Sequence, residues 1–144
     1  MNLASAPLAP ADPQVDPPAL ANAVTIPDGL PGFERCRQFV VMSSPDLAPL
    51  ARLQGLDGVR PSFFALDPRT VLPGYETALP PAERQRLEAR DDDALLWLAL
   101  VRLEGTRLLV NLRAPVVINP RRMLGLQLVA ADSPYSTHHE LLPG

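Results

Sequence analysis

The sequence predicts a mainly β fold: a small, barrel-like antiparallel β domain with one or two short helices. The first observation is a series of short runs rich in β-branched and aliphatic residues, separated at short intervals by turn residues. The second is the run at residues 94–103, ALLWLALVRL, which is apolar at odd and even positions alike. Such a run suits a central strand buried on both faces, with a buried helix as the competing interpretation. Strands at this spacing favour a small barrel or sandwich.

The composition is that of one folded domain preceded by a tail. The chain has 144 residues, of which 47% are hydrophobic and 20% charged, so it can bury a core without disulfides or metal. Residues 1–23 contain five prolines and no periodic apolar face, which predicts a disordered tail rich in proline and alanine. We therefore expect a single domain over residues 24–144. The lone Cys36 excludes an internal disulfide.

In the first half of the domain, residues 37–42 and 62–66 are strand candidates, each followed by a turn signal that contains proline. Between them, Ser44 is a reasonable N-cap, which predicts a short helix over residues 46–53, although Pro49 weakens that prediction. Residues 71–77 are predicted to be a bent, extended segment.

In the second half, Pro81 suits the first turn of a helix that continues over residues 82–90. Few of its residues are apolar, so we expect it to cover the core, and the aspartates 91–93 should end it in solvent. Glycine in Glu104-Gly105-Thr106 predicts a hairpin turn that leads into a returning strand at 107–112. Residues 115–119 and 124–130 form a further predicted strand pair.

The sequence contains no catalytic or cofactor-binding set. Arg35 and Arg37 could lower the pKa of the Cys36 thiol, but no base can be placed near it, and a buried structural cysteine is the favoured interpretation. His138 and His139 would point to opposite faces of a strand, which does not suit a shared metal site. Glycine-rich phosphate loops, G-x-S-x-G and metal-ligand spacings do not occur. We expect a non-enzymatic, protein-binding function with no cofactor and no metal.

Charge and hydropathy narrow the class of partner. All 13 basic residues are arginine, the net charge is −3, and five arginines lie between residues 101 and 122 against one acid. Binding of RNA or another protein through this arginine-rich segment is the alternative function, but the segment has no aromatic residue for base stacking. We therefore expect no direct nucleic acid partner. No signal peptide and no apolar run long enough to span a membrane are recognisable, which favours a cytoplasmic location.

Several motifs occur in an order that resembles one family. They are GLPGFE at 29–34, Leu53-Gln54, Phe63-Phe64, Asp67-Pro68, Tyr75-Glu76, NLRAPVVIN at 111–119, the G-x-Q-x-V of residues 125–129, and Asp132-x-x-Tyr135. This arrangement, over about residues 24–142, resembles the flagellar assembly factor FliW family. The sequence departs from the family at Pro27, where an aromatic is usual, at residues 57–61, which are usually more acidic, and at Arg113, where lysine is usual.

The resemblance implies a monomeric, mostly β, barrel-like protein that works in the cytoplasm by exchanging protein partners, as a chaperone and regulator of flagellum assembly. The family binds flagellin. When flagellin has been secreted, the family binds and antagonises the RNA-binding translational repressor CsrA, so that flagellin synthesis is matched to export.

The NLRAPVVIN segment also has a physical interpretation of its own. Pro115 cannot donate to a strand ladder, so the segment should consist of two strand pieces joined at a rigid corner. The corner could be a purely structural closure of the barrel, or it could leave a sheet edge for a partner, with Arg113 as an anchor. The candidate partner-binding residues are Asn111, Arg113, Pro115, Asn119, Gly29, Phe33, Tyr75 and Glu76.

Overall fold

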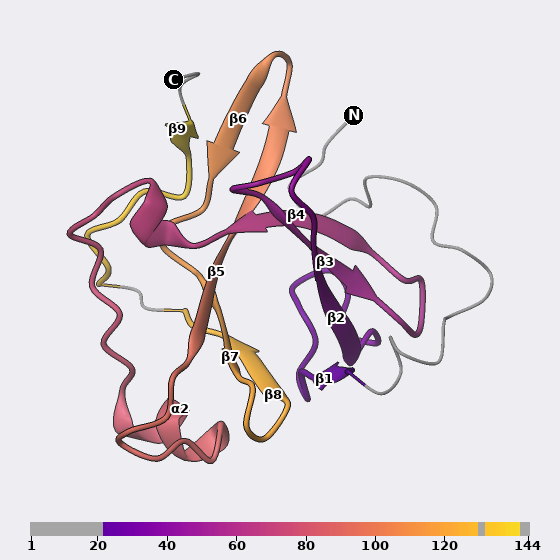
Figure 1. The fold of residues 1–144 in the computed structure, drawn as a ribbon, viewed down its shortest axis with the longest axis vertical. Coiled ribbons are helices and arrows are strands. Elements are labelled where there is room, and N and C mark those ends of the chain that lie inside the picture. Colours follow the sequence, from indigo (N-terminus) through magenta and orange to yellow (C-terminus); the bar gives the residue numbers. More distant parts are fainter. Residues whose placement is uncertain (1–21, 130–131, 142–144) are drawn as a thin grey trace.

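The computed structural model describes residues 22–129 and 132–141. The predicted tail at 1–23 lies almost wholly outside these ranges. Short strands account for most of the regular structure (Figure 1). The elements are β1 Val24–Thr25, β2 Gln38–Ser43, β3 Ala51–Gly55, β4 Ser62–Leu66, the 3-10 turn η1 Pro68–Thr70, α2 Pro81–Arg86, β5 Leu96–Glu104, β6 Arg107–Val110, β7 Val116–Asn119, β8 Leu124–Gln127 and β9 His139–Leu141.

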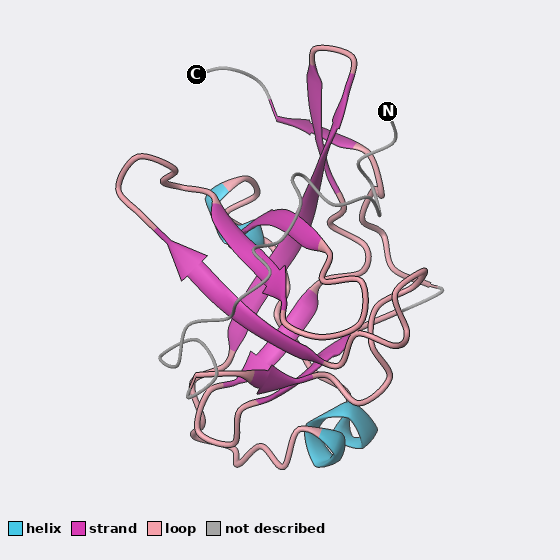
Figure 2. Cartoon of the chain, turned by 90° about the vertical axis from the view of Figure 1, so that its right-hand side faces the viewer, coloured by secondary structure: helices cyan, strands magenta, loops and turns pink. Residues whose placement is uncertain are grey.

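The strands close into a barrel, as the sequence predicts. The order β4-β3-β2-β1-β8-β7-β5 is completed by pairing of β4 with β5, which closes a ring of seven strands. All neighbouring pairs are antiparallel except β1 and β8, which are parallel. Strands β6 and β9 extend the sheet beyond the ring, and the β5–β6 hairpin projects from one end of the molecule (Figures 1 and 2). Its turn contains Gly105, whose φ of 63° confirms the predicted hairpin.

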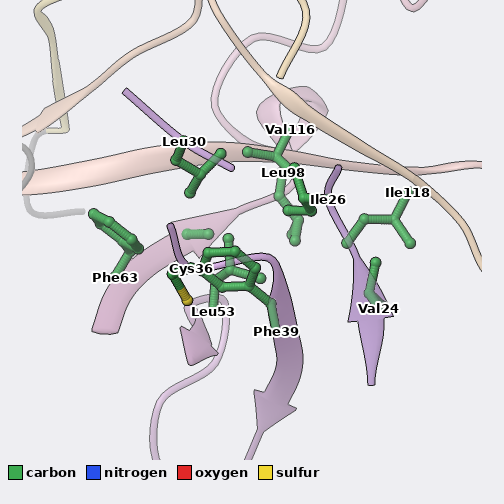
Figure 3. Close-up of a cluster of buried hydrophobic side chains, with 11 residues drawn as sticks. Val24, Ile26, Leu30, Cys36, Phe39, Leu53, Phe63, Leu98, Val116 and Ile118 are labelled. Carbon is green, nitrogen blue, oxygen red and sulfur yellow. The ribbon is translucent and has the colours of Figure 1, made fainter. Parts of the chain in front are cut away.

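Strand β5 is buried on both faces and separates two apolar clusters. Leu98 belongs to the cluster inside the barrel, together with Phe39, Leu53 and Val116 (Figure 3). Trp97 belongs to a second cluster, which the segment around Tyr75, Leu79 and Leu87 and the C-terminal region cover. The alternation confirms the central strand and excludes the buried helix, because neighbouring residues of a strand point to opposite sides of a sheet.

The helix predicted over residues 46–53 is wrong. Residues 45–49 form turns, and residues 51–55 form β3, which pairs with β2 on one side and β4 on the other. Pro49 would stand inside the predicted helix, where it lacks the N–H needed for the helical hydrogen bond. Leu53, fully buried inside the barrel, gains more from the sheet position than a capped surface helix would give it.

The helix after Pro81 is confirmed but shorter than predicted. It ends at Arg86, and Glu88 already has a φ of +51°. Asp91 and Asp92 are exposed, as predicted, but Asp93 is not. Asp93 lies in an ion pair with Arg121, at 3.0 Å between carboxylate oxygen and Nε, and only 9% of its side chain is exposed. The Arg121 guanidinium lowers the pKa of the Asp93 carboxyl.

Asn119 joins this helix to the barrel. Its side chain is fully buried, donates from Nδ2 to the Leu87 carbonyl at 2.9 Å, and accepts the Arg121 N–H at 3.1 Å. Each of these contacts satisfies a backbone group at the end of α2 or in the β7–β8 turn. Asn119 therefore connects two elements that no strand pairing connects. Strand β9 and the turn η1 are additional elements that the sequence analysis missed.

Replacement of Asn119 by alanine should lower the free energy of unfolding by about 2–3 kcal/mol, because it leaves a buried carbonyl and a backbone N–H without partners. The matched control is Arg122→Ala, which removes an ion pair with Glu88 whose two side chains are half exposed and should cost less than about 1 kcal/mol. Urea unfolding of both variants measures the difference. Equal effects of the two substitutions would contradict the bracing role of Asn119.

Candidate protein-binding site

The corner between β6 and β7 arises from a mismatch along β5. Val110 pairs with Val101, and Val116 pairs with Leu98. Residues 111–115 therefore face only residues 99 and 100 of β5, so three extra residues must leave the plane of the sheet. An insertion of this size bends the strand and removes backbone N–H and C=O groups from the hydrogen-bond ladder. The predicted rigid corner is present at this bulge.

Hydrogen bonds fix the corner at both ends. The Asn111 Oδ1 accepts the N–H groups of Arg113 at 3.1 Å and Ala114 at 3.2 Å, which is a side-chain-closed turn. The Asn111 N–H donates to the Leu100 carbonyl at 2.9 Å. Pro115 comes directly before β7, as a residue without an N–H requires, and its carbonyl accepts the Leu128 N–H at 2.8 Å. Asn111 is thus a brace within the corner.

A cleft on one side of the corner contains four of the candidate residues. We call it the tyrosine cleft; it has a volume of about 240 Å³. Arg113 and Pro115 come from the corner, and Tyr75 and Glu76 come from the segment that follows η1. The remaining wall is formed by Ala78, Trp97, Leu128, Asp132, Ser133, Pro134 and Tyr135. Residues far apart in the sequence therefore meet around one apolar floor with charged groups at its rim.

Two tyrosines hold the tyrosine cleft in shape. The rings of Tyr75 and Tyr135 are stacked, with centroids 4.4 Å apart and an interplanar angle of 27°. The Tyr75 hydroxyl donates to the Leu112 carbonyl at 2.7 Å, and the Glu76 N–H donates to the Tyr135 hydroxyl at 2.8 Å. Burial, with a smaller contribution from Tyr135, raises the pKa of Tyr75 to about 12. The phenol is therefore a neutral hydrogen-bond donor at physiological pH.

The molecule has two further cavities, and the first of them borders the corner. The first, of about 230 Å³, is lined by Asn111 and Ala114 of the corner and by residues of β4, β5, β6 and β8. The second, of about 200 Å³, is lined by Gly29 and includes the ion pair between Arg86 and Asp28. Pro31, Gln127 and Val129 line both cavities. We call the two together the β8 groove.

The GLPGFE segment is a tight turn beside the β8 groove. Gly29 has a φ of +64°, and a Cβ added there would lie 2.7 Å from the Glu34 Cα, so glycine is required by both conformation and space. Phe33 is half-buried and packs edge-on against Phe63, with ring centroids 5.6 Å apart at 81°. Gly29 therefore lines the second cavity, whereas Phe33 packs against Phe63, which lines the first.

The structure thus separates the candidate residues into three groups. Tyr75, Glu76, Arg113 and Pro115 meet in the tyrosine cleft, Asn111 and Gly29 line the β8 groove, and Asn119 and Phe33 support the framework. The sequence motifs included Tyr135, Gln127 and Val129 but did not identify them as site residues. An aromatic residue in an otherwise polar C-terminal stretch was the available signal for Tyr135.

The arginines of residues 101–122 do not form a bare basic surface. Arg102, Arg107, Arg121 and Arg122 lie in ion pairs with Glu104, Glu140, Asp93 and Glu88 respectively. Acidic partners at these positions compete with phosphate for the same guanidinium groups. This pairing disfavours the alternative in which the segment binds RNA.

The position of Cys36 fits a structural cysteine, not a reactive one. Cys36 is buried, and burial raises the pKa of its thiol to about 11, opposite to the effect considered for its arginine neighbours. Within residues 22–129 and 132–141, no group of three or more His, Cys, Asp or Glu side chains could hold a metal ion. In the same part of the chain, no helix is long and apolar enough to cross a membrane.

Comparisons with known proteins give one consistent family. The model of the FliW protein family matches residues 13–141. The flagellar assembly factor FliW of Anoxybacillus flavithermus is 34% identical over 122 residues, which cover 83% of each chain. That of Geobacter sulfurreducens is 31% identical over 121 residues, covering 83% of this chain and 76% of the relative. A crystal structure of the flagellar assembly factor FliW superimposes with a TM-score of 0.80 and 25% identity, covering 96% of both chains.

Replacement of Tyr75 by phenylalanine should change the alkaline stability of the protein. In the wild type, the unfolded phenol ionises near pH 10 whereas the folded one keeps its proton to about 12. The free energy of unfolding therefore falls as the pH rises from 10 to 12, because the unfolded state loses its proton first. The variant should lack this contribution and should be less stable at neutral pH by about 1 kcal/mol. Urea unfolding at pH 8, 10 and 11 measures both effects; an unchanged alkaline slope would contradict the assignment.

Replacement of Asn111 by alanine should cost about 1–2 kcal/mol of stability, since the N–H groups of Arg113 and Ala114 lose their common acceptor. Asn111→Asp is the matched variant, because its carboxylate oxygen can still accept both N–H groups. Thermal unfolding of the two proteins tests the brace. A melting temperature unchanged in Asn111→Ala would show that the corner keeps its shape without this side chain.

Proposed function

The chain belongs to the FliW family of flagellar assembly factors, and we propose that it binds flagellin in the cytoplasm and releases it for export. We further propose that the flagellin-free protein binds a CsrA-type translational repressor and antagonises it. An assembly factor acts on other proteins, so a protein partner follows from the family. Flagellin and CsrA are the partners that we propose.

The observation that carries the proposal is the tyrosine cleft. Its floor is made of Tyr75, Trp97 and Pro115, which are rigid side chains with large apolar surfaces. Clefts of this kind accept anchor side chains from a partner, because rigid aromatic walls lose little entropy on binding. Among the described residues that line the cleft, no nucleophile, base and orienting group are in mutual contact, so their composition suits recognition better than catalysis.

Arg113 gives the tyrosine cleft a directional contact. It stands in the corner, where Asn111 fixes the backbone of residues 113 and 114. A guanidinium on a fixed backbone can form paired hydrogen bonds with a carboxylate or with backbone carbonyls of a partner. Glu76 and Asp132 also line the cleft, so its rim presents both signs of charge. Such a rim favours one orientation of the bound segment over others.

Arg113→Ala should weaken flagellin binding roughly ten- to hundredfold, the effect of losing a hydrogen bond to a charged group. The melting temperature should change little, because the variant keeps the hydrogen bond from the backbone N–H of residue 113 to the Asn111 side chain. Arg122→Ala, outside the cleft, is the matched control and should bind normally. The measurement is isothermal titration with purified flagellin from the same cell, alongside thermal unfolding.

Three outcomes of this experiment separate the interpretations. Wild-type binding with loss in Arg113→Ala alone supports the tyrosine cleft as the flagellin site. Equal loss of binding and folding in Arg113→Ala would support a purely structural corner. Failure of the wild type to bind flagellin would contradict the proposed function itself. Repetition with the CsrA-type protein, with and without flagellin, tests whether one partner excludes the other.

A further inference from the structure

We propose that the β8 edge from Gly125 to Val129 is a docking site for an extended, apolar segment of the partner protein, which adds to the sheet as one more strand. The site is the β8 groove, which the proposal for the tyrosine cleft does not use. The inference rests on the proposed function only for the identity of the partner, flagellin.

A proline ends the ladder between β1 and β8. The two strands are parallel and pair only at Thr25 and Leu124, with the Thr25 N–H donating to the Met123 carbonyl at 2.9 Å. In a parallel ladder the next donor on β1 would be the N–H of residue 27. Residue 27 is a proline and has no N–H. The ladder therefore stops, and β8 continues without β1 beside it.

After Leu124, the backbone of β8 has N–H groups that point away from β7. The Leu128 N–H points toward β7, where it donates to the Pro115 carbonyl at 2.8 Å. Because successive residues of a strand direct their N–H groups to opposite edges, those of Gln127 and Val129 point to the β1 side. Within residues 22–129 and 132–141, no strand pairs with β8 on that side after Leu124. Unpaired edges of this kind are templates for an added strand.

The surface beside this edge of β8 is hollowed and partly apolar. Gln127 and Val129 line both of the cavities of about 230 and 200 Å³. Val129 is 72% exposed, one of four large hydrophobic residues of the described chain with substantial exposure. An added strand would cover Val129, and its alternate side chains would be about 7 Å apart, which suits entry into neighbouring cavities.

The side-chain amide of Gln127 has one group that a partner can satisfy. Its Nε2 donates to the Ala114 carbonyl at 3.0 Å, which fixes the amide, while its Oε1 is buried and has no hydrogen-bond partner among residues 22–129 and 132–141. A buried acceptor of this kind costs free energy until a donor reaches it. The side chain lines both cavities, so a hydroxyl or N–H of a docked segment can provide that donor.

These observations specify the chemistry of the occupant. The first cavity has Leu30, Phe63 and Leu109 in its walls, so side chains that enter it should be apolar and of moderate size. The free backbone groups of β8 require an extended segment, because a helix satisfies its own backbone and could not bond to them. The segment should therefore alternate valine-like residues with threonine- or serine-like residues.

The experiment compares two equally exposed valines. Val129→Asp should weaken flagellin binding at least about tenfold, because a charge would be buried at the edge of the added strand. Val59 is 73% exposed, lies in the loop between β3 and β4 and lines neither cavity, so Val59→Asp should bind as the wild type does. Both variants should fold normally. Flagellin binding that is unchanged in Val129→Asp would overturn the docking site without affecting the flagellin proposal.

Hydrogen exchange followed by NMR separates an added strand from other modes of contact. The Gln127 amide should exchange rapidly in the free protein and be protected in the saturated flagellin complex. An amide that stays unprotected there would overturn strand addition, since a docked helix would leave it without an acceptor. Self-association that protects Gln127 in the absence of flagellin would identify a second copy as the occupant and would also overturn the proposal.

A peptide probe keeps the inference testable if flagellin does not bind. The probe is an acetylated, amidated heptapeptide of alternating valine and threonine at millimolar concentration. It should shift the amide signals of Gln127 and Val129 in the wild type and in Val59→Asp, but not in Val129→Asp. Absence of these shifts in the wild type would overturn the strand-docking site.

Discussion

The corner beside the surfaces that we propose for partner binding forms because two strands, β6 and β7, share one edge of β5. β6 pairs with the second half of β5 and β7 with the first half, while β4 takes the other edge and closes the barrel. The chain between β6 and β7 is three residues too long for the two positions that it faces, and the excess becomes the corner. The tyrosine cleft is lined by Arg113 and Pro115 of this corner, and the first cavity of the β8 groove by Asn111 and Ala114.

Backbone groups of the corner and of the neighbouring segments that are not paired in the sheet need other hydrogen-bond partners. Three side chains supply them. Asn111 accepts two N–H groups within the corner, Tyr75 donates to the Leu112 carbonyl, and Asn119 attaches α2 below β7. Each bond is formed by a neutral group, so the framework does not depend on the charge state of the protein near neutral pH. The charged residues Arg113 and Glu76 line the cleft.

The parts of the fold that depend on local pattern could be predicted from the sequence. Apolar residues at both odd and even positions predicted β5, Gly105 predicted the hairpin that follows it, and Pro115 predicted the corner. The prediction of a helix over residues 46–53 was wrong because it gave more weight to the N-cap residue Ser44 than to Pro49. The burial of Leu53 is explained only by the pairing of β3 with β2 and β4. Arg113 and Glu76 are 37 positions apart, so no local pattern could show that they meet, and the open edge of β8 depends on a register that sequence cannot fix.

The parallel pairing of β1 with β8 has a consequence for how the molecule is made. Thr25 and Leu124 are 99 positions apart in the sequence, so the ring cannot close until residue 124 has left the ribosome. Contacts between such distant positions carry a high loop-closure entropy and form late. We expect β2, β3 and β4, which are neighbours in sequence and in space, to assemble first and to keep one apolar face uncovered during synthesis. The seam between β1 and β8 is then the last part of the barrel to form.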